Sequence, residues 1–259
     1  MISVTQMKLG EIEEILFGGV PDGEFLAACE NDNRAGVKRL LNRYANENAE
    51  KERLRALYAY EYAARDEGAT YVAGVDEAGR GPLAGPVVAA AVILPLGLFL
   101  PGLNDSKKVS PKKREALYGE ITEKAVAVKA AAVDAETIDR VNIYQAAINA
   151  MYDAIFGLSR KPEKVLIDAV ELKKLPMPSL AIVKGDAKSA SIAAASIVAK
   201  VTRDRMMAEY DAEYPQYGFI KHKGYGTADH VAALKKYGPC PLHRRSFEPV
   251  KSIAAGLGL

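Results

Sequence analysis

The 259-residue chain has little or none of several features that mark whole classes of protein. It has two cysteines, Cys29 and Cys240, which lie far apart, so we expect no disulfide framework and infer a reducing compartment. No apolar run approaches the roughly 18 residues that a membrane span requires. Acidic residues interrupt the N-terminal segment where a signal peptide would have its apolar core. These absences predict a soluble cytoplasmic protein with no membrane association.

The common signs of a serine or cysteine hydrolase are also missing. The chain has three histidines, and none of them forms a nucleophile-plus-base pattern in the sequence. Cys240-Pro-Leu-His243 has the spacing of half a zinc site but lacks a second half, so we interpret it as ordinary loop sequence. There is no internal repeat and no long heptad pattern, and we therefore expect a monomer.

The formal net charge is only +2, but the two parts of the chain differ in sign. Residues 1–70 contain 9 Lys and Arg against 13 Asp and Glu, which leaves 26 against 20 in residues 71–259. Clustered bases can bind a polyanion such as nucleic acid, or can simply form a solvated face. The two clusters are Lys107, Lys108, Lys112, Lys113 and Arg114, and then Lys221, Lys223, Lys235, Lys236, Arg244 and Arg245.

The pattern of the chain changes at Tyr71. Residues 1–70 have helical periodicity without a strand pattern, and we predict a small helical N-terminal appendage there. One long helical pattern runs from about Asn33 to Arg65 and ends at Gly68. Beyond Tyr71, strand-like runs alternate with helical patterns, which is typical of an α/β domain over residues 71–259.

Five apolar runs in this second part are predicted strands. The first two, 71–76 and 86–94, flank a glycine-rich turn and are expected to pair as an antiparallel hairpin. The other runs are 126–133, 164–168 and 180–186. Helices are predicted from Ser110, over about 143–155, over the alanine- and serine-rich segment 190–204, and from Thr227 to Gly238.

Three of these strands end in carboxylates: Asp76 with Glu77 beside it, Asp168, and Asp186. Ligands bind beyond the carboxyl ends of parallel strands in α/β sheets, so parallel neighbours would bring these four side chains together. Like charges at such a spot repel unless they are protonated or bridged by cations. Oxygen ligands without thiols suit Mg²⁺ or Mn²⁺. Taken singly, each aspartate also fits a turn or a helix cap after a strand.

Two glycine-containing segments are candidates for substrate contact. Gly79-Arg80-Gly81 combines close backbone approach with a planar guanidinium that suits phosphate. Downstream, Tyr225 lies between glycines and among bases, where it would either stack on a base or sugar or pack inside a loop.

At this point the motifs become recognisable. Asp76-Glu-Ala-Gly-Arg-Gly-Pro-Leu-Ala-Gly-Pro86 closely resembles the N-terminal signature of ribonuclease HII, the type 2 ribonuclease H. The resemblance covers about 71–247, and residues 1–70 are similar to the extra segment of some bacterial members. Further motifs follow in the family's order: Asn104-Asp-Ser-Lys-Lys108, Ile167-Asp168, Gly185-Asp-Ala-Lys-Ser189, Ala193-Ala-Ala-Ser-Ile-Val-Ala-Lys200 and Lys223-Gly-Tyr-Gly-Thr227.

The resemblance implies an RNase H-like fold, in which helices flank a five-stranded mixed sheet and the C-terminal portion is helical. It implies an endonuclease that cuts the RNA strand of RNA–DNA hybrids and nicks duplex DNA 5′ of a single embedded ribonucleotide. The implied mechanism uses two Mn²⁺ or Mg²⁺ ions and leaves 3′-hydroxyl and 5′-phosphate ends. Asp76, Glu77, Asp168 and Asp186 match the family's metal-binding catalytic acids.

The resemblance also assigns the substrate contacts. Gly79, Arg80 and Gly81 match the loop that senses the 2′-hydroxyl, and Tyr225 matches the tyrosine that packs on the neighbouring sugar. We expect the flanking bases, Lys107 and Lys108 and the stretch from Lys221 to Lys223, to hold phosphates.

Several alternatives stay open at this stage. The sister enzyme ribonuclease HIII shares the fold and acids but cuts junctions poorly, and the turn followed by Pro82-Leu83-Ala84 favours type HII. A catalytically silent binder of RNA–DNA hybrids is the rival from another class. Residues 1–70 would hold substrate, through a basic face of Arg34, Lys38, Arg39 and Arg43, or dock a partner, or form a stabilising cap.

Overall fold

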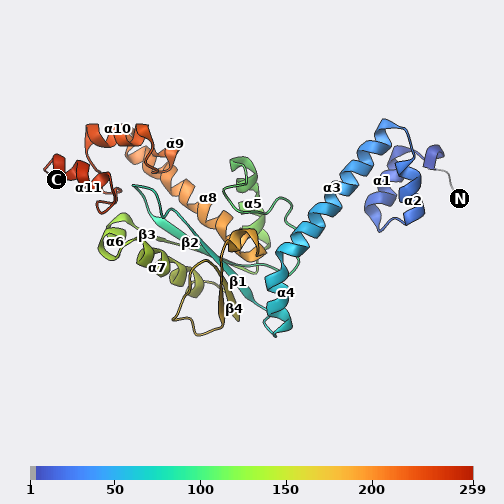
Figure 1. Ribbon diagram of the computed structural model, residues 1–259, viewed down its shortest axis with the longest axis horizontal. Helices are drawn as coiled ribbons and strands as arrows, with labels where there is room; N and C mark the ends of the chain where they lie inside the picture. The colour runs from blue at the N-terminus through green and yellow to red at the C-terminus, as the bar shows by residue number, and fades with distance from the viewer. Residues whose placement is uncertain (1–3, 259) are drawn as a thin grey trace. The chain divides into compact units, whose positions relative to one another are not determined.

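The computed structural model describes residues 4–258, and its contacts divide the chain into two compact units at Arg55–Ala56 (Figure 1). The first unit is helical, as predicted. It contains the short 3-10 helix η1 (Val4–Gln6), α1 (Leu9–Gly18), α2 (Gly23–Glu30) and most of α3 (Ala35–Leu57). Its core consists of Val4, Ile12, Leu16, Cys29, Val37 and Leu40.

The proposed basic face of this unit is partly used in internal contacts. Arg34 pairs with Asp32 at 2.7 Å and donates to two backbone carbonyls near the N-terminus. Arg43 pairs with Glu13 at 2.6 Å and lies over the ring of Phe17. Neither arginine therefore presents its guanidinium as a simple solvated charge.

The long helical pattern that ends near Arg65 is two helices in the structure. α3 ends at Leu57, and α4 (Ala59–Asp66) begins after Tyr58. Tyr58 is buried, and its hydroxyl donates to the carbonyl of Leu98 at 3.0 Å. Periodicity alone could not reveal this break, because the partner of Tyr58 lies 40 residues away in the sequence.

The second unit is built on a five-stranded mixed sheet of order β3-β2-β1-β4-β5, which confirms the predicted fold. β1 pairs antiparallel with β2, and β2 pairs antiparallel with β3, so the predicted hairpin is present. β1, β4 and β5 are parallel neighbours. The strands are β1 (Val72–Ala78), β2 (Val87–Ile93), β3 (Ala127–Val133), β4 (Lys164–Asp168) and β5 (Ser179–Ile182).

Helices cover both faces of this sheet (Figure 1). On one face, α7 packs its apolar side against alternate residues of the strands. On the other face lies the long helix α8, and a Cβ on Gly74 would come within 2.0 Å of the Ser191 backbone. The alanine- and serine-rich sequence of α8 was predicted to permit this close approach, and its small residues are buried.

The remaining elements complete this unit. They are α5 (Pro111–Lys124), α6 (Ala135–Val141), α7 (Ile143–Phe156), the 3-10 turn η2 (Gly185–Ala187), α8 (Ala190–Glu213), η3 (Pro215–Tyr217), α9 (Phe219–His222), α10 (Ala228–Tyr237) and α11 (Val250–Gly256). Ser110 and Thr227 cap α5 and α10, as predicted, and Ser189 caps α8, which was not predicted. Among the described helices, none combines the length and the apolar character that a bilayer span needs.

Candidate active site

The sheet topology brings the predicted acids to one edge. Val75 of β1 lies beside Ile167 of β4, so the next residues along the two strands are Asp76 and Asp168. Asp168 in turn lies beside Ile182, the last residue of β5. β1 extends to Ala78, so Asp76 and Glu77 belong to the strand rather than to the loop after it.

Asp76 lies in a buried and negatively charged environment. It is only 6% exposed and accepts the Glu77 N–H at 2.7 Å. Burial raises the pKa of Asp76 well above its usual value, the charges of Glu77 and Asp168 raise it further, and a hydrogen bond from Ser196 opposes the shift. A carboxyl group in this state is costly to ionise without a cation.

Glu77 has one satisfied and one unsatisfied carboxylate oxygen. Its Oε1 accepts from Arg80 at 3.2 Å, whereas Oε2 is buried and has no hydrogen-bond partner among the described residues. Burial raises the pKa of Glu77, and the positive charge of Arg80 acts in the opposite direction. A buried oxygen without a donor is the kind of atom that a bound cation would satisfy.

Asp186 lies in the turn η2 between β5 and α8. Burial raises its pKa, and the charges of Asp105 and then Asp168 add to this rise. The neighbouring Gly185 N–H donates to Asp168 Oδ1 at 2.6 Å, which connects the two acids through the backbone. Asp105, from the Asn104-Asp-Ser-Lys-Lys108 motif, thus acts on the site electrostatically, a role that was not predicted.

The backbone around these acids is strained. Ala169 directly follows Asp168 with a φ of 52°, and Lys184 precedes the Asp186 turn with a φ of 57°. Residues with a Cβ rarely occupy this left-handed region, which costs them roughly 1–2 kcal/mol. Such strain clusters at functional sites, where the fold holds side chains in a required position.

The oxygen-only donor set fits a hard divalent cation. Within residues 4–258, no three His, Cys, Asp or Glu side chains are already grouped as metal ligands. The raised pKa values of Asp76, Glu77 and Asp186 nevertheless show carboxyl groups under mutual repulsion and poor hydration. Cation binding relieves both costs, and carboxylates are the ligands that Mg²⁺ and Mn²⁺ prefer.

Beside these acids is a cavity of about 240 Å³ that gathers most of the predicted substrate residues. Lys108 does not line it, and its ammonium lies 4.0 Å from Asp105 instead. Ser106, Ser196 and Lys200 also line the cavity and were not predicted individually, although their motifs were recognised. The lining residues are Glu77, Ala78, Gly79, Arg80, Gly81, Ser106, Lys107, Ser196, Lys200 and Tyr225.

The turn that contains Gly79, Arg80 and Gly81 depends on glycine geometry. Gly79 has a φ of 94°, and a Cβ there would lie 2.1 Å from Nε of Arg203. Tyr225 is 45% exposed, so its ring is available to a ligand instead of packed inside the loop. A Cβ on Gly81 would lie 3.9 Å from the Tyr225 ring, which places the turn and the tyrosine side by side.

Two buried arginines, Arg203 and Arg244, support these segments from the protein interior, and neither role was predicted. Arg244 donates to the carbonyls of Gly79 at 2.6 Å, Arg80 at 2.9 Å and Gly85 at 2.9 and 3.0 Å. Assigning Arg244 to a solvated or nucleic-acid-binding face was therefore wrong, because its side chain is fully buried. Burial lowers the pKa of Arg244 to about 9, with a contribution from the charge of Arg203, so it stays protonated at neutral pH.

Arg203 of α8 makes similar contacts to the segment after the glycine turn and to the loop that carries Tyr225. It donates to the carbonyls of Ala84 at 3.1 Å, Pro86 at 2.9 Å and Lys223 at 3.0 Å. The Gly224 carbonyl accepts the N–H of Leu83 at 2.8 Å. The loop that carries Tyr225 is thereby fixed to the segment that follows the glycine turn.

His230 and His243 form a buried pair under the same loop, and the partly exposed ring of His222 stacks on His230. His243 Nδ1 accepts the Cys240 N–H at 3.0 Å, so its Nε2 carries the hydrogen and donates to Nε2 of His230 at 3.1 Å. His230 Nδ1 then donates to the carbonyl of Tyr225 at 2.9 Å. The segment from Cys240 to His243 is a loop, as interpreted, but both side chains are buried in the core instead of lying on its surface.

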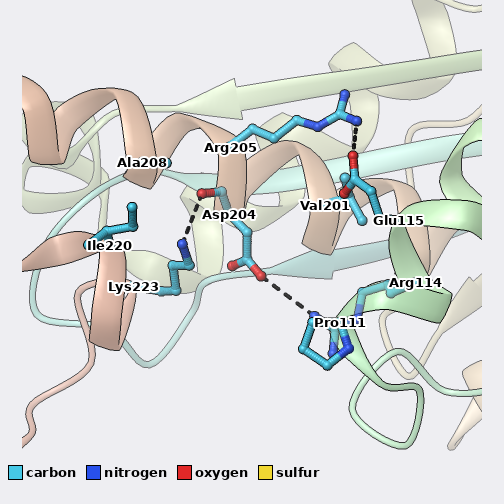
Figure 2. Close-up of a pocket in the computed structure, with 9 residues that line it drawn as sticks. All are labelled: Pro111, Arg114, Glu115, Val201, Asp204, Arg205, Ala208, Ile220 and Lys223. Atoms are coloured by element: carbon cyan, nitrogen blue, oxygen red, sulfur yellow. Dashed lines mark hydrogen bonds and ion pairs between the residues drawn. The ribbon is translucent and has the colours of Figure 1, made fainter.

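Figure 2 shows a second pocket, of about 310 Å³, on the neighbouring surface of α8. Asp204 is central to it and pairs with Arg114 at 3.6 Å, while Lys223 donates to the Asp204 carbonyl at 3.4 Å. Arg205 pairs with Glu115 across the same pocket. Lys223 therefore faces this pocket and does not line the cavity beside the acids.

Comparisons with known proteins agree with this geometry. A family model described as Ribonuclease HII matches residues 73–250, and one described as Ribonuclease HII N-terminal domain matches residues 8–65. The chain is 53% identical over 226 residues to the Ribonuclease HII of Bacillus anthracis, covering 86% of this chain and 88% of that protein. It is 50% identical over 239 residues to that of Bacillus cytotoxicus, covering 91% and 92%.

A solved structure also resembles the chain. The ribonuclease H2 from Pyrococcus horikoshii matches with a TM-score of 0.63 and 28% identity, over 73% of this chain and 99% of that one.

Proposed function

Because the chain belongs to the ribonuclease HII family and is a ribonuclease H, we propose that it nicks duplex DNA on the 5′ side of a single embedded ribonucleotide, besides cutting the RNA strand of hybrids. In this reaction the oxygen of a water molecule forms a new bond to phosphorus and the bond to the 3′-oxygen breaks. The products are a 3′-hydroxyl and a 5′-phosphate end.

One observation carries the proposal: the glycine turn, the exposed tyrosine and a catalytic acid share one cavity. Gly79, Arg80 and Gly81 line it from one side, Tyr225 from another, and Glu77 joins them to the acids of the sheet edge. A protein distinguishes RNA from DNA at one nucleotide by reading the 2′-hydroxyl, which both donates and accepts a hydrogen bond. A rigid backbone turn offers both kinds of group without a flexible side chain.

The four acids are proposed as the ligands of two divalent cations, Mn²⁺ or Mg²⁺. Bound there, such cations supply Lewis acidity to the attacking and the departing oxygens of a phosphate. Asp76 and Asp168 lie at the carboxyl ends of adjacent strands, and Glu77 and Asp186 flank them. Their buried setting holds the carboxylates in place, and Lys107 brings positive charge to the cavity wall, whereas the ammonium of Lys200 pairs with Asp204 at 2.7 Å.

Tyr225 is proposed to set the preference for a ribonucleotide followed by DNA. Its exposed ring beside Gly81 would pack against the sugar next to the one that the turn reads. A flat ring at that position favours a sugar without a 2′-hydroxyl, because a hydroxyl pressed against it loses its hydration. This account gives a physical reason for cleavage at RNA–DNA junctions.

Replacing Tyr225 by alanine tests this role, and the choice of control matters. Tyr217 is a poor control, because it is buried, donates to the Gly238 carbonyl at 2.8 Å and stacks on Phe219. Tyr237 is 49% exposed and serves as the matched control. We expect Tyr225→Ala to lower cleavage of a single-ribonucleotide duplex by roughly 10-fold, as the loss of 1–3 kcal/mol of stacking implies, while Tyr237→Ala keeps activity. Equal losses in the two variants would contradict the assignment.

A further inference from the structure

Helix α4 carries a buried carboxylate, that of Glu61, which is not one of the four acids proposed to bind metal. Glu61 is 3% exposed, and its Oε1 accepts from Ser189 Oγ at 2.6 Å and from the Ser191 N–H at 2.8 Å. Its Oε2 is buried without a hydrogen-bond partner among the described residues. Both donors belong to the start of α8, where unpaired N–H groups and the helix dipole favour a negative charge.

A buried carboxylate is a costly way to join two elements. Replacing such a group by a packed apolar side chain is often neutral or stabilising, so stability alone gives little reason for a charge here. The surrounding contacts of α4 are already apolar, since Ala64 packs with Val72, Leu166 and Ile192. The position of Glu61 therefore calls for a role other than cohesion.

From Glu61, three consecutive hydrogen bonds lead to a catalytic acid. Ser189 donates its Oγ–H to Glu61, and its backbone N–H donates to the Gly185 carbonyl at 2.8 Å. The N–H of Gly185 then donates to Asp168 Oδ1 at 2.6 Å. Asp186 is the next residue after Gly185, so the same turn orients both acids.

We propose that Glu61 is a positioning residue for the active site, which fixes the Gly185–Ala187 turn and through it the carboxylates of Asp168 and Asp186. This inference rests on the proposed metal-dependent cleavage. The turn is tightly packed against its neighbours, because a Cβ on Gly185 would lie 2.6 Å from Ile192 and 3.3 Å from Asp168 Oδ1. A small shift at the cap of α8 is consequently transmitted to the acids.

Helix α4, the last helix of residues 1–70, would thereby support the active site. The N-terminal family model covers residues 8–65 and so includes all of α4 except its last residue, yet the contacts of α4 place it in the unit that starts at Ala56. A division at residue 70 therefore separates Glu61 from the turn that it supports.

The test compares Glu61→Gln, Glu61→Ala and Ser189→Ala with Glu67→Gln in the full-length protein. Glu67 is the matched control, because it lies at the end of α4 and its carboxylate is exposed and paired with Lys164. The readouts are kcat and KM on a single-ribonucleotide duplex, the Mn²⁺ concentration for half-maximal activity, and the rise in Tm that Mn²⁺ causes in the absence of substrate.

Loss of a partner that orients metal ligands typically costs 10- to 100-fold in metal affinity or activity. For Glu61→Gln and Ser189→Ala we expect kcat to fall about 10-fold and the half-activating Mn²⁺ concentration to rise, with KM within about twofold. A Glu61→Gln/Ser189→Ala double variant should be little worse than either single variant, because the two groups act in one hydrogen-bonded chain. Glu67→Gln should match the wild type.

Two outcomes would overturn the inference. One is a Glu61→Gln protein with unchanged kcat and Mn²⁺ dependence. The other is a Glu61→Ala protein whose Tm falls while kcat and Mn²⁺ dependence per folded molecule stay at wild-type values, which would leave a purely structural role. If the wild type itself failed to nick the duplex, the proposed function would fail instead, and the Mn²⁺-induced rise in Tm would still test the effect of Glu61 on the acids.

Discussion

Replacing Arg244 by lysine should change the shape of the glycine turn, and with it the activity, while the rest of the protein stays folded. The guanidinium makes four hydrogen bonds to three carbonyls, those of Gly79, Arg80 and Gly85. An ammonium keeps the charge but cannot span this fork. At least one buried carbonyl is left without a donor, which costs about 1–3 kcal/mol of unfolding free energy. The carbonyls of the turn would then rotate away from their present positions.

The effect on catalysis follows from the contacts that this turn is proposed to make. If it offers two hydrogen bonds to the 2′-hydroxyl at about 1 kcal/mol each, their loss lowers kcat/KM roughly 30-fold. The assay is single-turnover nicking of a duplex with one ribonucleotide, with urea unfolding as the stability measurement. Arg245→Lys is the control, because Arg245 is adjacent and exposed. The reasoning would be refuted if Arg244→Lys kept the wild-type kcat/KM. It would also be refuted if the loss of activity were fully explained by the fraction of the variant that is unfolded under the assay conditions.

Other parts of the structure carry further predictions. Asp76→Asn should abolish turnover and raise Tm, because it removes a buried charge that repels Glu77; a lower Tm in thermal unfolding would count against this. Burial lowers the pKa of His243 to about 4 in the folded protein. As the pH drops from 6.5 to 4, this histidine therefore takes up a proton in the unfolded chain but not in the folded one, and the free energy of unfolding falls by about 3 kcal/mol. His243→Asn should flatten that part of the unfolding-versus-pH curve, and an unchanged slope would contradict the assignment. Lys107→Met should weaken hybrid binding and reduce the slope of log K against log salt by about 1, whereas an unchanged slope would place this lysine away from phosphate. Deleting residues 1–55 should leave a folded enzyme, whereas deleting 1–70 removes α4 and should lower Tm and activity sharply; similar behaviour of the two deletions would contradict this division.

Local patterns predicted the parts of this protein that depend on neighbours in the sequence. The hairpin of β1 and β2 follows from two apolar runs around a glycine turn, and the caps at Ser110 and Thr227 follow from their local sequence. The parallel arrangement that brings Asp76 and Asp168 to one edge was expected from strands that end in acids.

The parts that escaped prediction depend on contacts between residues far apart in the sequence. Arg244 contacts Gly79 across 165 residues, and Glu61 contacts Ser189 across 128. Charged side chains are usually exposed, so the sequence around Arg244 and Glu61 gives no sign that these two residues are buried. The histidine cluster was hidden for the same reason, because His230 and His243 become neighbours only when α10 packs on the C-terminal loop.

Junction cleavage can be measured on a labelled DNA duplex with one ribonucleotide, incubated with the protein and Mn²⁺ or Mg²⁺. An all-DNA duplex and the Asp76→Asn variant are the controls. We expect a single metal-dependent nick on the 5′ side of the ribonucleotide, with a 3′-hydroxyl end, and none in either control. Cleavage of a long RNA–DNA hybrid without that nick would contradict the proposed junction activity and indicate a ribonuclease HIII-like specificity. Binding without any cleavage would contradict the catalytic assignment of the acids.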